Sequence, residues 1–237
     1  MLSPLQHGIR RVFLPLLDFF YPPVCPSCNK LLPDGQQHVC EECWNSIRTV
    51  DQHLGLYQET RSKLLASGVI DDLVASFVFE KEGAFQHVAH ALKYSGVQSL
   101  GIELGRRLGA VINDWGLRAD CLVPVPLHKQ KLRERGYNQA ELIARGVSVA
   151  TGIPVNARIV LRKRFTQTQT ALSLEERQKN VKDAFGLRDS IFVQISGRSF
   201  ILIDDVITTG ATVEACAREL RRAGASRIVA ASSALAQ

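Results

Sequence analysis

Two adjacent carboxylates and a run of small hydroxyl residues follow an apolar segment near the C-terminus. Residues 200–203 are continuously apolar, which is typical of a parallel strand buried on both faces, and we expect this strand to stop at Asp204 and Asp205. A short run then opens an expected helix that ends at Gly224. The run consists of Thr208, Thr209, Gly210, Ala211 and Thr212. Because ligands bind at the carboxyl ends of parallel strands, the pattern predicts a ligand site here.

The two halves of this stretch suit different parts of one ligand. A glycine-containing loop at the start of a helix offers backbone N–H groups, hydroxyls and the positive end of the helix dipole to a phosphate. The paired aspartates would repel that phosphate, so we expect them to accept hydrogen bonds from a diol or to approach the ligand through a divalent cation. A sugar phosphate satisfies both halves. The alternative is a strand end with a solvated acidic turn and a threonine that caps the helix.

The stretch resembles the phosphoribosyl-pyrophosphate (PRPP) binding motif of type I phosphoribosyltransferases. The resemblance implies that Asp204 and Asp205 hold the ribose 2′- and 3′-hydroxyls, and that residues 208–212 cradle the 5′-phosphate. It also implies that Mg²⁺ accompanies the ligand. The commoner phosphate-binding motifs, G-x-G-x-x-G and G-x-x-x-x-G-K-[ST], are absent from the sequence.

A second chemical pattern lies near the N-terminus, where four cysteines form two C-x2-C pairs separated by eleven residues. The four are Cys25, Cys28, Cys40 and Cys43. Two tight turns can present four thiolates to one tetrahedral zinc ion, and the segment is too short to build a core of its own, so we expect a structural zinc site. A disulfide and an iron–sulfur cluster are the alternatives. Cys121 and Cys216 lie in apolar patterns that are typical of core residues.

A cation-rich segment follows a second apolar strand, residues 121–123, which Pro124 is expected to end. We expect residues 127–137 to form a loop, with the next helix starting at Asn138. The candidate pyrophosphate ligands in this loop are His128, Lys129, Lys131 and Arg133. Basic side chains at the carboxyl end of a strand are well placed for a polyphosphate, and a solvated charge run is the alternative.

A third polar segment starts at Arg162 and shows no periodicity. We expect residues 162–170 to form a mobile flap, followed by a short helix that carries Arg177. A cationic lid that excludes water would suit a phosphoribosyl transition state, which resembles an oxocarbenium ion beside departing pyrophosphate. The candidate catalytic residues are therefore Arg162, Arg164 and Arg177. A plain surface loop and a DNA-contact patch are the alternatives.

The order of these segments is similar to that of the ComF family of phosphoribosyltransferase-like competence and DNA-utilisation proteins. The similarity is carried by P-V-P-L-H-K at residues 124–129, by R-E-R-G-Y-N-Q at residues 133–139 and by the four cysteines, and it extends from about residue 22 to the C-terminus. It implies binding of PRPP and, in some members, of single-stranded DNA. It further implies competence or DNA-processing proteins as partners.

We therefore predict an α/β chain with a type I phosphoribosyltransferase fold, that is, a central parallel sheet with flanking helices, preceded by a small zinc-ribbon-like module. The predicted boundaries are 1–60 for the N-terminal helix and zinc module and 61–237 for the phosphoribosyltransferase-like domain. Residues 45–70 are expected to connect the two units. Because nothing after the last expected strand can cover the sheet, the zinc module and this connection are expected to form a hood over the acceptor.

Composition restricts the partners and the location. A net charge of +6 and a pI near 9.1 favour anionic partners. The mean hydropathy is close to zero, and no apolar run is long enough for a membrane span. Arg10 and Arg11 superficially resemble a twin-arginine signal, but Pro15 and Asp18 interrupt the apolar run that follows. We therefore expect a cytoplasmic protein.

The function predicted from these observations is that of a PRPP-binding protein that takes part in handling imported DNA, in natural competence or DNA utilisation. If it turns over, a nucleophile displaces pyrophosphate at the anomeric carbon. One alternative is a PRPP sensor or a single-stranded-DNA adaptor without turnover, in which Arg162, Lys163 and Arg164 bind DNA together with residues 128–135. Another is a nucleotide-salvage phosphoribosyltransferase.

Overall fold

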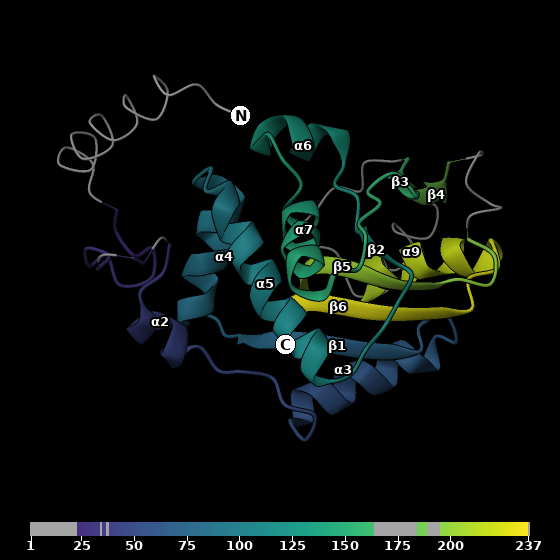
Figure 1. Cartoon of the computed structure of the whole chain (residues 1–237), viewed down its shortest axis with the longest axis horizontal. Helices are drawn as coiled ribbons and strands as arrows, with labels where there is room; N and C mark the ends of the chain where they lie inside the picture. Colours follow the sequence, from purple (N-terminus) through teal and green to yellow (C-terminus); the bar gives the residue numbers. More distant parts are fainter. Residues whose placement is uncertain (1–22, 34, 37, 164–183, 189–194, 237) are drawn as a thin grey trace.

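A four-stranded parallel sheet forms the centre of the molecule, with the strand order β1-β6-β5-β2 (Figure 1). Its strands are β1 (Asp72–Phe79), β2 (Cys121–Pro124), β5 (Ser199–Ile207) and β6 (Arg227–Ala236). The computed structural model describes residues 23–33, 35–36, 38–163, 184–188 and 195–236. Within these ranges, the predicted α/β architecture with a central parallel sheet is confirmed.

Helices cover both faces of the sheet (Figure 1). One face packs against α3 (Gly55–Ala66), α9 (Ala211–Arg222) and the antiparallel pair β3 (Val160–Arg162) and β4 (Phe185–Leu187). The opposite face packs against α4 (Ala84–Tyr94), α5 (Gln98–Asp114) and α7 (Gln139–Thr151). We call these the α9 face and the α4 face.

This two-sided cover explains why the strands are apolar without alternation. In β5, Phe200 and Leu202 pack on the α9 face, whereas Ile201 and Ile203 pack on the α4 face, and all four are buried. The prediction that this strand is buried on both faces is therefore confirmed. The prediction that the strand stops at the aspartates is wrong, because β5 continues to Ile207 and stays paired with β6.

The sheet is irregular at the level of the aspartates. Ile203 and Val206 both pack on the α4 face, although strict alternation would place residues three apart on opposite faces. The neighbouring strands change in the same way, since Val74 and Phe77 share that face in β1, and Ala231 and Ala234 share it in β6. The site thus lies where the regular pleat of three strands is broken.

Two further segments differ from the sequence predictions. Residues 45–70 contain the helix α3, whose buried residues Tyr57 and Leu64 lie two turns apart. The predicted basic loop contains the helix α6 (Lys129–Arg135), which ends at Gly136 in the left-handed conformation with φ +78°. Both helices escaped prediction because their apolar pattern is weak, α6 having no buried residue at all.

The zinc module packs against the α4 face. Its short helix α2 (Glu41–Ser46) carries Trp44, whose ring stacks on Phe77 at 5.8 Å between centroids and lies 3.9 Å from the guanidinium carbon of Arg107. The predicted domain boundary after residue 60 falls inside α3, which packs on β1. The division into two units stays a prediction.

Some predictions fall on residues outside the described ranges. They concern the N-terminal helix, the flap from residue 164 onward and the short helix expected to carry Arg177. Among the residues that are described, no helix combines the length and the apolar character that crossing a membrane would require.

Candidate functional site

Asp204 and Asp205 lie half-buried in the last third of β5, and local hydrogen bonds orient their carboxylates. One carboxylate oxygen of Asp204 accepts a hydrogen bond from the backbone N–H of Asp205 at 2.9 Å, and one of Asp205 accepts from the N–H of Val206 at 2.9 Å. Each aspartate therefore keeps a second carboxylate oxygen for another partner.

The two aspartates have different neighbours. Asp205 Oδ2 forms an ion pair of 2.8 Å with Nζ of Lys93, in the last turn of α4. Asp204 interacts electrostatically with Arg162 in β3 and with Cys216 in α9, both on the opposite face of the sheet. The pair thus connects the two layers of helices across the sheet.

These surroundings separate the pKa values of the two carboxyls. Burial and the charge of Asp205 raise the pKa of Asp204 well above its usual value. Burial would also raise the pKa of Asp205, but the Lys93 ammonium outweighs it and lowers that pKa. Asp205 is therefore the charged partner of Lys93, while Asp204 is the carboxyl of the pair that takes up a proton at the higher pH.

The candidate phosphate loop follows β5 directly. Thr208, Thr209 and Gly210 form a turn, and α9 begins at Ala211 with Thr212 half-buried in its first turn. The backbone N–H of Ala211 lies 3.4 Å from the hydroxyl oxygen of Thr209, which accepts its hydrogen bond. A helix of twelve residues therefore points its N-terminus, with the positive end of its dipole, toward the loop.

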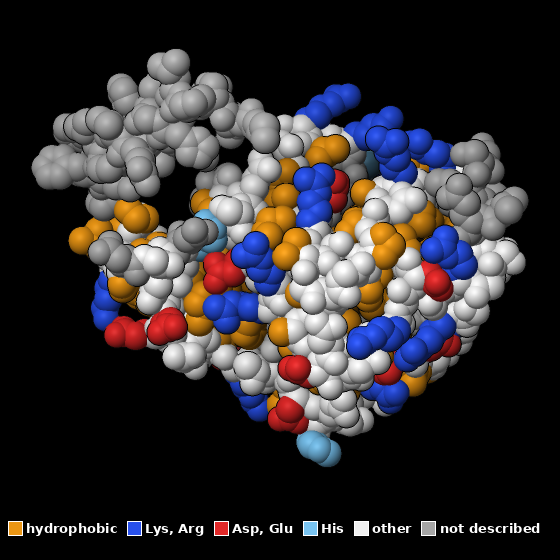
Figure 2. All heavy atoms as spheres, in the orientation of Figure 1, with side chains coloured by type: hydrophobic (Ala, Val, Ile, Leu, Met, Phe, Trp, Pro, Cys, Tyr) orange, Lys and Arg blue, Asp and Glu red, His pale blue; other side chains and the backbone are white. Residues whose placement is uncertain are grey.

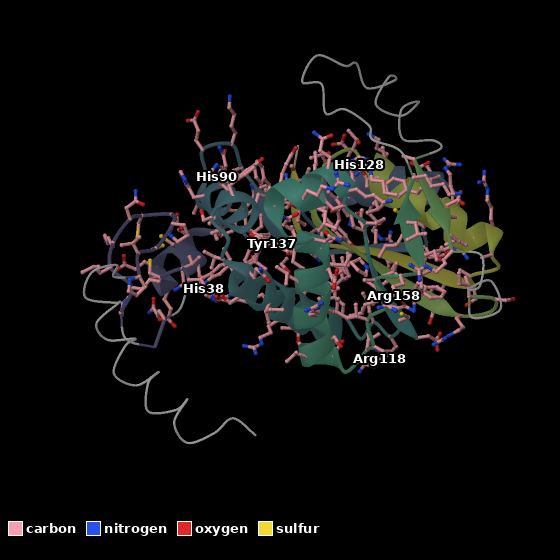
Figure 3. The ribbon with its side chains drawn as sticks, turned by 90° about the horizontal axis from the view of Figure 1, so that it is seen from above. His38, His90, Arg118, His128, Tyr137 and Arg158 are labelled. Carbon is pink, nitrogen blue, oxygen red and sulfur yellow. The ribbon has the colours of Figure 1, made fainter. Side chains whose placement is uncertain are left out.

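The candidate pyrophosphate ligands lie on and just before α6. His128 caps this helix, because its Nδ1 accepts a hydrogen bond from the N–H of Gln130 at 3.2 Å. Lys129, Lys131 and Arg133 follow on the helix itself, and basic side chains gather along this edge of the molecule (Figure 2). His128 directly precedes α6 and Tyr137 lies two residues beyond it, and both are labelled in Figure 3. The helix replaces the predicted loop but keeps its cations together.

Several cations near this helix influence one another. Burial lowers the pKa of Lys131, and the charges of Arg135, Arg162 and Lys93 lower it further. Desolvation together with the charges of Arg162 and Lys129 lowers the pKa of His128. Five positive side chains therefore repel one another next to the acidic pair, Asp204 and Asp205, and an anionic ligand would stabilise this arrangement. The five are Lys93, Lys129, Lys131, Arg135 and Arg162.

Two of these cations were missed as site residues. Arg135 belongs to the basic run, and its guanidinium carbon lies 5.4 Å from the ring centroid of Tyr94. Lys93 lies in a different helix, next to the apolar residue Leu92, where a basic residue is ordinary in the last turn of a helix. No motif distinguished it, so only the tertiary structure brings it to Asp205.

The candidate catalytic arginines are only partly described. Arg162 lies in β3, with its guanidinium carbon 5.3 Å from the ring centroid of Phe185 in β4. Burial lowers its pKa, against the opposing influence of Asp204. Arg164 and Arg177 lie outside the described residues. The structure therefore brings Arg162 to the acidic pair and leaves the roles of the other two as predictions.

A pocket of about 610 Å³ opens at the carboxyl ends of β1 and β6, beside Thr208. Its lining combines apolar and charged side chains, from Arg48, Leu54, Leu56, Val78, Phe79, Glu80, Lys81, Thr208 and Ala236. Residues from the connection before β1 thus line a pocket at the edge of the sheet where the candidate ligand groups lie. The four cysteines are not among the lining residues, and the predicted hood stays a prediction.

The four cysteines of the zinc module converge. Their Sγ atoms all lie within 4.8 Å of one another, and those of Cys28 and Cys40 are 3.7 Å apart. All are free thiols, which excludes the disulfide alternative for this structure. Four sulfurs at about 2.3 Å from a central zinc ion would be separated by about 3.8 Å, so the donor set fits a tetrahedral structural site.

The thiols of this cluster differ in acidity. Burial raises the pKa of Cys43 to about 12. Burial also acts on Cys25, but hydrogen bonds from the backbone of Cys40, Cys28 and Ser27 outweigh it and lower that pKa to about 7. Backbone N–H groups that favour a thiolate are what a metal–thiolate site requires.

Comparison with protein families finds two matches in the same order as the structure. A double zinc ribbon domain matches residues 16–54, and a phosphoribosyl transferase domain matches residues 134–236. The first match contains the four-cysteine cluster and favours zinc over iron. The second contains β5, the acidic pair and α9, so the predicted fold and its N-terminal zinc ribbon are confirmed.

Curated relatives cover most of the chain. Competence protein F of Haemophilus influenzae is 30% identical over 86% of this chain and 87% of its own length. DNA utilization protein YhgH of Escherichia coli K12 is 34% identical over 87% of this chain and 94% of its own. Competence protein ComFC of Bacillus subtilis is 27% identical over 85% and 72%. The chain therefore belongs to the ComF family of competence and DNA-utilisation proteins.

Proposed function

We propose that this chain binds PRPP at the carboxyl edge of the sheet. The observation that carries the proposal is the order of three groups of side chains there. The α9 N-terminus and residues 208–210 offer a phosphate site, the acidic pair offers acceptors for a diol, and the α6 cations offer a pyrophosphate site. PRPP carries a 5′-phosphate, a ribose diol and a pyrophosphate in that order, so one ligand engages all three.

The assignment of residues follows this order. Asp204 and Asp205 accept hydrogen bonds from the ribose hydroxyls. The 5′-phosphate is held by Thr208, Thr209, Gly210, Ala211 and Thr212, and the pyrophosphate by His128, Lys129, Lys131 and Arg133. Lys93 and Arg135 also belong to the proposed PRPP site, because their charges act on Lys131 and, for Lys93, on Asp205. This site would function in the cytoplasm, as the sequence predicts.

If the chain is a catalyst, it transfers the phosphoribosyl group. A nucleophile forms a bond to the anomeric carbon while the bond to the pyrophosphate oxygen breaks, and the leaving group departs with both bonding electrons. The α6 cations and Arg162 stabilise the charge that develops on pyrophosphate. The pocket beside Thr208 is our candidate for the acceptor, with Phe79 and Glu80 in its lining.

Calorimetric titration with PRPP tests the binding. Asp204→Asn combined with Asp205→Asn removes charge at nearly constant volume, so we expect at least a tenfold loss of affinity in a folded variant. Asp114→Asn, at the exposed end of α5, is the matched control and keeps wild-type affinity. Wild-type protein without heat or thermal stabilisation at millimolar PRPP would contradict the proposal. Binding without pyrophosphate release, across a panel of nucleobases and ammonia, would favour a sensor.

A second candidate function is binding of single-stranded DNA. It is favoured by the exposure of α6, which carries basic side chains, and of Tyr94, whose side chain is 64% exposed beside Arg135. The names of the relatives connect them with competence and DNA utilisation. An adaptor of this kind would bind DNA with a steep salt dependence and without turnover of PRPP.

A further inference from the structure

Lys93 holds a position between opposite charges. Its Nζ lies 2.8 Å from Asp205 Oδ2, and both side chains are largely enclosed, with 26% and 21% exposed. Its charge is also stabilised by Asp204 and opposed by Arg135. The ammonium therefore lies at the boundary between the acidic pair and the α6 cations.

The last turn of α4 is fixed on both sides of Lys93. The hydroxyl of Tyr137 donates a hydrogen bond to the carbonyl oxygen of Leu92 at 2.6 Å. The ring of Tyr94 lies against the guanidinium of Arg135. Three consecutive residues of α4 thus contact Tyr137 just beyond α6, Asp205 in β5 and Arg135 at the end of α6, so Lys93 is held in place by its neighbours.

This arrangement disagrees with a divalent ion at the acidic pair. Mg²⁺ takes carboxylate oxygens at about 2.0–2.1 Å in near-octahedral geometry. Here Oδ2 of Asp205 forms the ion pair with the Lys93 ammonium, and Oδ1 accepts a hydrogen bond from the Val206 N–H. A divalent ion bound to Asp205 would also stand next to Lys93 and close to Lys131, and like charges at such distances repel strongly. The residues present therefore do not fit a magnesium ion on Asp205.

We propose that Lys93 is the resident cation of the acidic pair, which excludes a divalent metal from Asp205 and takes over its neutralising role when PRPP binds. The second half of this statement rests on the proposed function, whereas the first half concerns the protein without ligand. Lys93 has two further N–H donors beyond the one that Asp205 uses, so it can contact a ligand anion without leaving its partner.

The first experiment needs no PRPP. Mn²⁺ is titrated into the full-length, zinc-loaded protein, and free Mn²⁺ is followed by electron paramagnetic resonance. We expect wild type and Lys93→Arg to show no binding that depends on Asp205, and Lys93→Met to bind one Mn²⁺ at least tenfold more tightly. Adding Asp205→Asn to Lys93→Met should abolish the new site. Lys63→Met, at an exposed position of α3, controls for loss of one positive charge.

The second experiment measures PRPP affinity in two buffers. One is freed of divalent ions on a chelating resin, and the other contains millimolar Mg²⁺. The zinc content of the protein is checked afterwards. Wild type should change less than threefold, whereas Lys93→Met should lose at least tenfold without Mg²⁺ and recover when it is added. Asp205-dependent Mn²⁺ binding by wild type would overturn the proposal, even if Lys93→Met failed to fold. So would a Lys93→Met variant that matches wild type throughout. If wild type binds no PRPP at all, the proposed function fails, and the Mn²⁺ result still decides the role of Lys93.

Discussion

A Cβ atom placed on Gly210 would lie 2.5 Å from Cδ2 of Leu64. Leu64 belongs to α3 and is 1% exposed, while Gly210 precedes α9 with φ +79°. The segment before β1 thus packs directly beneath the candidate phosphate loop. Gly210 is required for two reasons, the left-handed backbone and the close approach of Leu64.

Replacement of Gly210 should therefore act through packing as well as through ligand binding. Gly210→Ala should lower the free energy of unfolding by about 1–2 kcal/mol from the backbone alone, plus the cost of displacing Leu64. Leu64→Ala alone should cost about 2–5 kcal/mol. Chemical denaturation of the two single variants and the double variant should give a coupling of about 0.5–3 kcal/mol, because Leu64→Ala relieves the contact. Strict additivity would contradict the packing seen here.

The raised pKa of Asp204 predicts a characteristic pH dependence of stability. A carboxyl whose folded pKa is raised binds more protons in the folded than in the unfolded state, so stability falls as pH rises from its usual pKa toward the raised one. Asp204→Asn removes this titration and should melt higher than wild type near neutral pH, by about 2–4 °C for each kcal/mol recovered. The difference should shrink at pH 4. A pH-independent difference, or one equal to that of Asp114→Asn, would exclude this explanation.

Loss of metal should destabilise the zinc module first. Purified protein should contain about one equivalent of zinc, and Cys25→Ser or Cys40→Ser should lose it. Because Trp44 stacks on Phe77 next to the cluster, its fluorescence should report the loss. Cys121→Ser, in a strand of the central sheet, should leave zinc content unchanged. Stoichiometric iron, or metal-free protein of normal stability, would contradict the assignment.

The elements that the sequence predicted well are those with strong apolar patterns. The buried strand before Asp204, the helix after Gly210 and the two cysteine pairs each carry a local signal. The structure contains the strand and the helix next to each other, and it gathers the four cysteines into one cluster. The start of α7 at Asn138 also carries a local signal, because asparagine is a favoured residue at the N-terminus of a helix. The structure confirms it, since the side chain of Asn138 accepts a hydrogen bond from the N–H of Ala140 at 3.2 Å.

The residues that escaped prediction act through tertiary contacts. The residue preceding Lys93 belongs to the apolar face of α4, and nothing in the local sequence connects Lys93 with β5. The helix α6 was read as a loop because helix periodicity requires a buried face, which α6 lacks. The end of β5 was placed too early because carboxylates are rare inside a sheet, and here Lys93 and the broken pleat accommodate them.

PRPP and single-stranded DNA should compete, because both proposed sites use the cations of α6. A triple variant, Lys129→Gln with Lys131→Gln and Arg133→Gln, should bind both ligands at least tenfold more weakly. In fluorescence anisotropy with labelled single strands, its slope of log affinity against log salt should be smaller in magnitude by about 2.

The control for this experiment is a double variant, Arg118→Gln with Arg158→Gln, which removes positive charge far from His128 (Figure 3). It should keep both affinities. Saturating PRPP should displace DNA from wild type. Tyr94→Ala should weaken DNA binding by about 1–3 kcal/mol through lost stacking, and should weaken PRPP binding less, because Tyr94 reaches the proposed PRPP site only through Arg135. If PRPP leaves DNA affinity unchanged, or if the triple variant keeps its salt slope, the two ligands do not share α6, and DNA must bind elsewhere on the chain.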